Sequence, residues 1–385
     1  MVTKDNNDCL EYINSFKIRV IKDEVRFWMV RTKKGYFYDE FISNRFIALG
    51  WNVITKSTDM GAQSLDALKK EISNVYGDAK PAGSINKCKN FIYDIQEGDY
   101  VIIPNKGSTG IAIAKAGEYF EEIEYDVEQE KIVIAKIENR EYEISQVRCP
   151  YKKRRHIKIL NVVDINTLGY GVRRAITSYH GISNFDAYAI DILNGIYDCY
   201  SYLGNVYLSI NIAKQGKLRP REISKLMYSL TEFFCCLVDE ESISTTINLN
   251  SPGAIRIKLE EGFEKIKQFK IPLVCMFLAV TGGSAFGVEL PGMAGAIKAY
   301  RTMDVEIEKE KINLEIQKID KEAKQEELEN KKLENIQKYL ELKKQASEQG
   351  LNMNEIMKQL EMLQELDTSL EFKTKETEAV RESDS

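Results

Sequence analysis

Apolar and polar positions divide the N-terminal part of the chain into short extended segments, turns and helices. Residues 27–32 (FWMVRT) combine aromatic and β-branched side chains, which favour a strand, and the turn residues 33–35 (KKG) end that strand. Residues 46–51 (FIALGW) also combine aromatic and aliphatic side chains and are expected to form a second strand. Residues 64–76 place apolar side chains at helical spacing behind a serine that suits the N-cap, and a second helix is expected over 84–95.

The pattern then becomes strand-like over a long stretch. Strands are expected at 100–104 (YVIIP), after a Gly-Asp turn, and at 110–120 (GIAIAKAGEYF). The β series continues through 131–137 (KIVIAKI), 141–145 (EYEIS) and 156–160 (HIKIL). An aromatic-rich helix over 184–200 closes this part of the chain.

A second region follows with its own order of elements. It contains a strand at 205–213, an amphipathic helix at 222–238, a strand at 244–250 and a possible partner strand at 254–259. This alternation indicates a small α/β unit.

Residues 271–288 (IPLVCMFLAVTGGSAFGV) are the most apolar stretch of the sequence. Eighteen residues at about 1.5 Å each reach about 27 Å, just short of a hydrocarbon core of roughly 30 Å. The glycines at 282, 283 and 287 break a helix in its second half. We therefore favour burial in the protein or in an oligomer interface over insertion in a membrane.

From residue 305 to about residue 366 nearly every side chain favours a helix. Ile312, Ile316, Ile319 and Ala323 follow the spacing of a coiled-coil seam. Self-association through this helix, packing back on the body of the protein, and a solvated helix without a partner all remain open. The last residues, 369–385, have the composition of a disordered tail.

These patterns predict an α+β protein with several parts. They are a lead-in (1–25), a domain of mixed strands and helices (26–183), a second small α/β domain (184–300), a charged long helix or coiled coil (301–368) and a tail (369–385).

Charge is distributed unevenly along this arrangement. Residues 301–385 hold 15 Lys and Arg against 22 Asp and Glu, a net charge of −7. Subtraction from the totals of 54 and 59 leaves 39 against 37, or +2, for residues 1–300. The acidic character belongs to the C-terminal part, so the globular part has room for a basic face.

The residues that usually carry catalysis or hold metals are sparse. The seven cysteines are scattered without a CxxC pair, and the two histidines, His156 and His180, have no cysteine at ligand spacing. No phosphate-binding loop and no GxGxxG fingerprint are present. We expect no catalytic residue, no metal and no cofactor, and the scattered cysteines fit a reducing cytoplasm.

Several short fragments occur in an order that resembles a known family. They are WMVR at 28–31, Gly35, Asp39, Phe41, ALGW at 48–51, KPAGSI at 80–85, Phe91, Ile95 and GDYV at 98–101. This order resembles the EVE/PUA-like domains at the N-termini of Mrr-type restriction proteins, over about residues 26–183. Residues 207–253 resemble accessory domains of bacterial defence proteins, which have no chemistry attached to them.

The first resemblance implies a curved sheet that binds one modified base, flipped from DNA or present in RNA. The candidates for stacking on that base are Trp28, Tyr36 and Trp51, and the candidates for polar contacts are Arg31 and Ser84. The run Lys152, Lys153, Arg154 and Arg155 is the candidate for phosphate contacts. Three of these assignments have a structural alternative. Trp28 could be a core residue, Ser84 could begin a helix, and the basic run could keep an edge strand soluble.

Together these observations favour a non-catalytic sensor of a nucleic acid or nucleotide in a prokaryotic antiphage defence system. Its partners would be DNA, RNA or a nucleotide, further copies of the chain, and an effector protein. The alternatives are a protein attached to the inner membrane through residues 271–288 and a scaffold without a nucleotide site.

Overall fold

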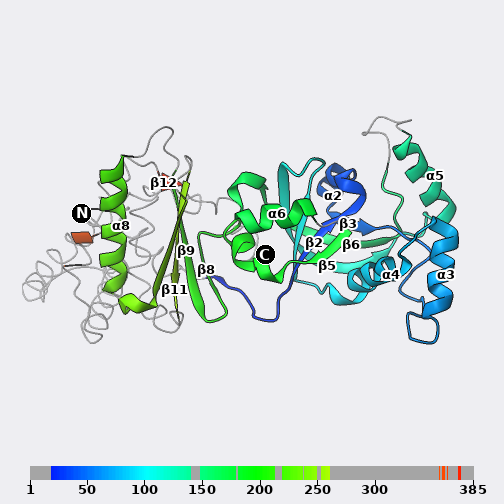
Figure 1. The fold of residues 1–385 in the computed structure, drawn as a ribbon, viewed down its shortest axis with the longest axis horizontal. Helices are drawn as coiled ribbons and strands as arrows, with labels where there is room; N and C mark the ends of the chain where they lie inside the picture. The colour runs from blue at the N-terminus through cyan, green and yellow to red at the C-terminus, as the bar shows by residue number, and fades with distance from the viewer. Residues whose placement is uncertain are drawn as a thin grey trace, which may run out of the picture. The chain divides into compact units, whose positions relative to one another are not determined.

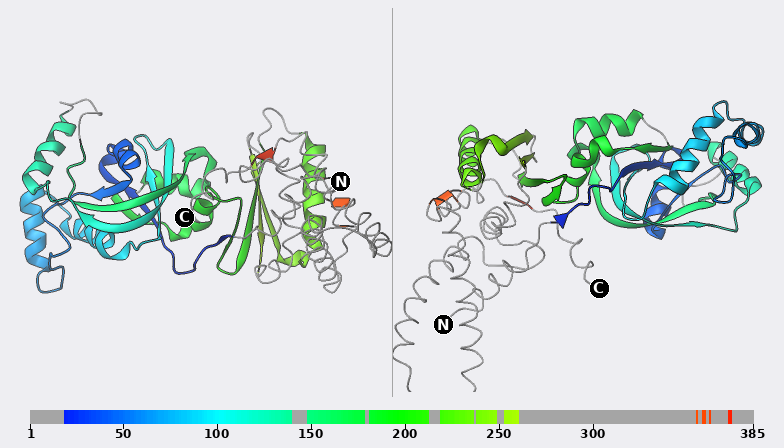
Figure 2. Two further views of the ribbon diagram at one scale, coloured as in Figure 1. Left: turned by 180° about the vertical axis from the view of Figure 1, so that it is seen from behind. Right: turned by 90° about the horizontal axis from the view of Figure 1, so that it is seen from below.

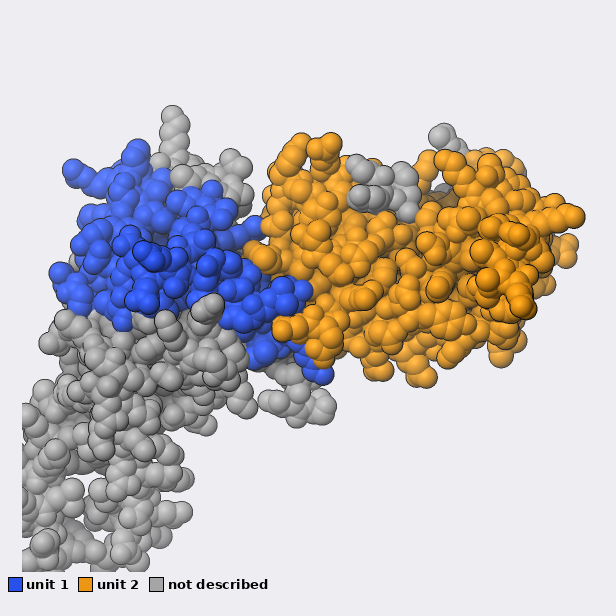
Figure 3. All heavy atoms as spheres, turned by 60° about the horizontal axis from the view of Figure 1, so that its bottom comes forward, with its two compact units in different colours: residues 1–22, 197–385 blue, residues 23–196 orange. Residues whose placement is uncertain are grey.

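The computed structural model describes residues 19–139, 148–178, 181–212, 219–236, 238–248 and 253–260, with isolated residues between 355 and 373. These residues divide into two compact units. One comprises residues 23–196, and the other combines residues 1–22 with residues 197–385 (Figure 3). We call the first the inserted unit, because it interrupts the sequence of the second, which we call the flanking unit.

The inserted unit is built on a six-stranded sheet in the order β3-β6-β5-β4-β2-β7 (Figure 1). Neighbouring strands run antiparallel except β2 and β4, which are parallel. The strands are β2 (Phe27–Arg31), β3 (Phe46–Leu49), β4 (Tyr100–Pro104), β5 (Gly110–Glu121), β6 (Lys153–Asp164) and β7 (Gly181–Asn184).

This sheet is curved because its two longest strands are irregular. The pairing of β5 with β6 shifts register between Ile113 and Ala114 and again between Ala116 and Tyr119. Such bulges bend a strand and increase its twist, and the curl is visible in the views of Figure 2. The predicted α+β class with a curved sheet is confirmed at this level.

Helices accompany the sheet of the inserted unit. They are α2 (Tyr38–Asn44), α3 (Leu65–Tyr76), α4 (Pro81–Lys89), α5 (Val127–Glu138), α6 (Tyr170–Ser178) and α7 (Ala189–Leu193). Buried side chains of α2, α3 and α4 join those of the strands in one apolar cluster. Strand β2 lies between β4 and β7, and Phe27, Trp28, Met29 and Val30 are all buried, so both faces of the sheet are covered there.

The flanking unit contains a second sheet, in the order β1-β8-β9-β11-β10. Its strands are β1 (Arg19–Val20), β8 (Cys199–Tyr202), β9 (Asn205–Ile212), β10 (Ile243–Asn248) and β11 (Gly253–Leu259). Helix α8 (Pro220–Cys235) buries Leu226, Leu230, Phe233 and Phe234 along one side. The antiparallel pairing of β10 with β11 confirms the partnership expected from the sequence.

The boundaries between parts differ from the sequence-based ones. The lead-in (1–25) supplies β1, which pairs in parallel with β8, so its end belongs to the sheet of the flanking unit. Residues 184–196 belong to the inserted unit, because the backbone amide of Phe185 donates to the carbonyl of Phe27 at 2.7 Å. The tail (369–385) contributes a short strand, β12 (Phe372–Lys373), which pairs with the end of β9.

Two local predictions are wrong. Residues 131–137, expected as a strand, lie in α5, which begins with a capping box between Asp126 and Gln129 and places Ile134 and Ile137 on one face. The helix expected over 184–200 is only a short turn and α7, after which Cys199 to Tyr202 form β8. Residues 141–145 lie outside the described residues.

Among the described residues, no helix has both the length and the apolar character needed to cross a bilayer. Residues 271–288 lie outside the described residues, as does most of the predicted coiled coil at 301–368.

Candidate functional site

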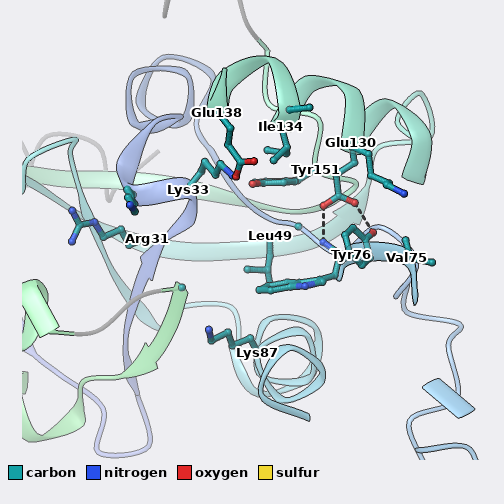
Figure 4. Close-up of a pocket in the computed structure, with 16 residues that line it drawn as sticks. Arg31, Lys33, Leu49, Val75, Tyr76, Lys87, Glu130, Ile134, Glu138 and Tyr151 are labelled. Carbon is teal, nitrogen blue, oxygen red and sulfur yellow. Dashed lines mark hydrogen bonds and ion pairs between the residues drawn. The ribbon is translucent and has the colours of Figure 1, made fainter. Parts of the chain in front are cut away.

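A cavity of about 580 Å³ opens in the inserted unit beside the end of β3 (Figure 4). Its walls come from the end of β3 and the residues after it, from the end of α3, from α4 and α5, and from the turn after β2. Ligand cavities in proteins usually enclose roughly 300–1,000 Å³. The volume therefore suits a small organic ligand.

Trp51 lines this cavity in an unusual backbone conformation. Its φ is +60°, in the left-handed region that residues other than glycine seldom adopt. The backbone amides of Trp51 and Asn52 each donate to the Glu130 carboxylate at 2.7 Å. The ammonium of Lys153 donates to the carbonyls of Trp51 and Ile54, also at 2.7 Å. A buried anion on one side and a buried cation on the other thus hold the tryptophan in place.

The Glu130 carboxylate is itself saturated with donors. The Tyr76 hydroxyl donates to its second oxygen at 2.7 Å, in addition to the two backbone amides (Figure 4). Burial, followed by the charge of Glu130, raises the pKa of Tyr76 well above its ordinary value, so the phenol stays protonated and remains the donor. Glu130 therefore organises the wall of the cavity rather than offering a free carboxylate to a ligand.

Aromatic and aliphatic surfaces face the cavity beside these polar groups. Figure 4 shows the ring of Tyr151 beneath Ile134 and Glu138, on the side of the cavity opposite Lys87. Gly50 leaves room for this ring, because a Cβ at position 50 would lie 2.9 Å from its Cε1 atom. Leu49 completes the apolar surface. Burial raises the pKa of Tyr151 well above its ordinary value, so this wall is uncharged at neutral pH.

The cavity lining carries more cations than anions. Five basic side chains line it, against two carboxylates, those of Glu130 and Glu138. The basic residues are Arg31, Lys33, Lys34, Lys87 and Lys131. The Lys87 ammonium lies 5.8 Å from the centre of the Trp51 ring, and Lys33 forms an ion pair with Glu138. This excess of positive charge favours an anionic ligand.

The structure brings two of the five predicted ligand-binding residues to the cavity, Trp51 and Arg31. Arg31 lies at its edge, with its guanidinium directed at the carbonyl of Ile176 (3.4 Å). Tyr36 is outside, packed edge-on against Phe37 with Lys106 over its ring. It does not line this cavity.

Trp28 and Ser84 are also outside the cavity. Trp28 is 2% exposed, and its indole N–H donates to Asp99 at 2.9 Å, so it is a core residue with its polar atom satisfied. Ser84 is buried within α4 and donates its hydroxyl proton to Asp78. In the structure both side chains are buried with their polar atoms bonded within the protein, and neither faces this cavity.

The predicted phosphate contacts fail for a similar reason. Lys153, Arg154 and Arg155 are at most 8% exposed. Lys153 binds carbonyls in the 51–54 loop, Arg154 donates to the carbonyls of Tyr151 and Cys149, and Arg155 donates to those of Phe91, Ile92 and Gly117. These cations thus donate to buried backbone carbonyls, which need donors. Lys152 alone is partly exposed, and it lies in the bend directly before β6 and does not line the cavity.

Sequence reasoning missed Glu130, Tyr151, Lys33, Lys34 and Lys87. Glu130 and Tyr151 lie far from Trp51 in sequence, and residues around Glu130 have a strand-like composition. Lys33 and Lys34 could have been identified from the sequence, because two lysines before a glycine indicate an exposed turn directly after a strand.

No group of three or more His, Cys, Asp or Glu side chains that could hold a metal occurs in the part of the chain that the structure describes. The cavity lining, with its excess of cations, is unlike a site for a metal ion.

The family described as "Domain of unknown function (DUF8426)" matches residues 28–162. The matched range lies within the inserted unit and includes Trp51, Glu130 and Tyr151. No curated protein and no solved structure matches the chain.

Proposed function

We propose that the inserted unit binds one planar base, as part of a nucleotide or of a nucleic acid, in the cavity beside Trp51. The observation that carries this proposal is the combination of an aromatic wall with a surplus of cations in a cavity of about 580 Å³. Aromatic side chains bind bases by stacking on them, which contributes about 1–3 kcal/mol per base. Cations provide the complementary attraction for phosphate.

The fixed position of Trp51 supports a binding role. A left-handed tryptophan costs backbone free energy, and such conformations concentrate at sites where a side chain must be presented in one orientation. Here Glu130 and Lys153 hold the backbone of Trp51 in that conformation before any ligand arrives, through its amide and its carbonyl. A side chain already ordered loses less entropy on binding, which strengthens the complex.

An EVE/PUA-like identity for the inserted unit remains part of the proposal. The curved sheet and its helices are consistent with it, and the cavity contains the tryptophan of the ALGW fragment at 48–51. Under this proposal the ligand is a modified base, and the unit distinguishes it from the unmodified one.

Equilibrium binding with the full chain tests the proposal. The ligands are nucleosides, nucleotides and short single-stranded DNA and RNA, each with unmodified bases, 5-methylcytosine or N6-methyladenine. Trp51→Ala should weaken binding by about 5- to 150-fold, since it removes the stacking surface. Tyr170→Ala is the matched control, because Tyr170 is 71% exposed and does not line the cavity.

Two results would count against base binding. The first is negligible affinity of the wild-type chain for every ligand. The second is measurable affinity that Trp51→Ala and Tyr170→Ala leave equally unchanged, since the ligand would then bind elsewhere.

The wider role that we propose is sensing within a prokaryotic defence system, with self-association through residues 301–368. It rests on the sequence alone. Light scattering of the full chain and of a chain ending at residue 300 checks the second part, because loss of the helix should lower the mass of the assembly. An unchanged assembly would remove the helix from this role.

A further inference from the structure

Three lysines line the cavity from two separate elements. Lys33 and Lys34 belong to the turn after β2, and Lys87 comes from α4. Figure 4 shows Lys33 beside Glu138 and Lys87 across the cavity from them, whereas Glu130 and Tyr76 lie away from Lys33. Lys33 therefore approaches the cavity away from the Glu130 carboxylate, which already accepts hydrogen bonds from Trp51, Asn52 and Tyr76.

The turn that carries Lys33 and Lys34 has an unusual backbone. Their φ values are 47° and 55°, and Gly35 follows at 80°, so three successive residues are left-handed. Gly35 presses against the neighbouring turn, where a Cβ would lie 2.7 Å from the carbonyl carbon of Asn105. Non-glycine residues keep such a conformation only where the surroundings impose it, and they concentrate at ligand sites.

The ion pair between Lys33 and Glu138 occupies this part of the cavity in the absence of a ligand. The Lys33 side chain is 24% exposed and that of Glu138 is 62% exposed. Among the described residues, Glu138 forms no other hydrogen bond. Ion pairs that are this accessible to solvent stabilise a fold only weakly. A better anion can replace Glu138 on Lys33 at little cost.

We propose that Lys33 and Lys34 form a phosphate subsite, and that phosphate takes the place of Glu138 on Lys33. This inference rests on the proposed function, since the base would lie against Trp51 while its phosphate meets these two lysines. The Lys87 ammonium, 5.8 Å from the centre of the Trp51 ring, would lie near the base rather than in the phosphate subsite. The cavity then selects a phosphorylated nucleoside over the bare nucleoside.

The phosphate has two possible sources, a free nucleotide or the backbone of a single strand. Binding of a nucleoside, its 5′-monophosphate and a short oligonucleotide of the same base separates them. Tighter binding of the monophosphate than of the nucleoside supports the subsite. An oligonucleotide that binds at least as well as the monophosphate identifies the backbone as the source, and one that binds more weakly identifies the free nucleotide.

Variants of the two ion-pair partners give effects of opposite sign. Lys33→Gln should weaken the monophosphate about tenfold and leave the nucleoside unchanged, because one charge-assisted hydrogen bond is lost. Glu138→Gln should strengthen the monophosphate, because the competing carboxylate is gone. Lys34→Gln should repeat the loss seen with Lys33→Gln, because both side chains belong to the subsite.

The exposed ion pair between Lys69 and Asp66 on α3 provides matched controls. Lys69→Gln and Asp66→Asn change the net charge by the same amounts away from the cavity and should alter neither affinity. Equal affinity of the wild-type chain for nucleoside and monophosphate would overturn the subsite, as would Lys33→Gln and Lys34→Gln behaving like Lys69→Gln. If nucleoside binding remains sensitive to Trp51→Ala, the base site stands without the subsite, whereas no binding of any ligand overturns both.

Discussion

Two groups of cationic side chains lie in the inserted unit and have opposite surroundings. Lys153, Arg154 and Arg155 follow one another along β6 and are buried, each donating to backbone carbonyls. Lys33 and Lys87 reach a cavity from separate elements. The denser run of charge thus holds loops together, while cations far apart in sequence gather where a ligand would bind. The two groups are distinguished by how many hydrogen bonds their side chains donate to the backbone. The density of charge along the sequence does not distinguish them.

The largest effect should come from removing a buried cation. Lys153→Met keeps the length of the side chain and removes a donor from the carbonyls of Trp51 and Ile54, although the Trp51 carbonyl keeps the backbone amide of Ile54 at 2.9 Å. We expect the free energy of unfolding to fall by about 1–3 kcal/mol, the cost of one buried carbonyl left unsatisfied.

Lys33→Met is the counterpart in the cavity and should change the free energy of unfolding by less than about 1 kcal/mol. Chemical denaturation of both variants measures the contrast. Equal losses of unfolding free energy in the two variants would contradict the distinction between the buried cations of β6 and the cations of the cavity.

The two tryptophans extend the comparison with a smaller effect. Trp28→Phe removes the indole donor of Asp99, whose carboxylate also accepts the backbone amides of Arg26 and Gln96. We expect a loss of about 1–2 kcal/mol in the free energy of unfolding, with base binding unchanged.

Trp51→Phe should do the reverse, weakening base binding while leaving stability within about 1 kcal/mol. Thermal unfolding measures the stability of each variant, and ligand titration on the same samples measures its affinity for the base. A loss of binding in Trp28→Phe at a temperature where it is folded would contradict the core assignment.

The smallest effect concerns the dependence of stability on pH. Burial lowers the pKa of the Lys153 ammonium below its ordinary value of 10.5, although Cys88 and Glu130 oppose the shift. A cation whose pKa is lowered by folding adds stability above the unfolded value, and this stability is lost as the pH falls through the folded value.

The wild-type chain should therefore gain stability over Lys153→Met as the pH rises from neutrality toward 10.5. Denaturation curves of both proteins at several pH values measure the difference. A difference that stays constant with pH would show that the buried ammonium titrates as it does in the unfolded chain.

The sequence was informative wherever local pattern determines structure. The strand at Phe27 and the pair formed by β10 and β11 follow from alternation and turn residues. The pattern was insufficient at 131–137, because isoleucines spaced for a helix face also alternate as in a strand, and the cap at Asp126 decided between them.

The candidate site was predictable only in part for a different reason. Trp51 was recognisable beside Gly50 at a strand end, but Trp28 has the same residue type and a different environment. Glu130, Tyr151 and Lys87 meet Trp51 only through the tertiary fold, so no spacing in the sequence connects them. Burial of the run at 153–155 likewise depends on loops from three other parts of the chain.

The pairing of β1 with β8 has a consequence for folding order. Arg19 and Val20 lie beside Tyr200 and Ser201, although the whole inserted unit separates them along the chain. Bringing such distant residues together carries a large loop-closure entropy unless the intervening chain is already compact. Once the inserted unit has folded, the hydrogen bond between Phe185 and Phe27 brings together the segments by which the chain enters and leaves it. The sheet of the flanking unit should therefore be completed only after the inserted unit has folded. A destabilising substitution inside the inserted unit, such as Lys153→Met, should also delay the pairing of β1 with β8.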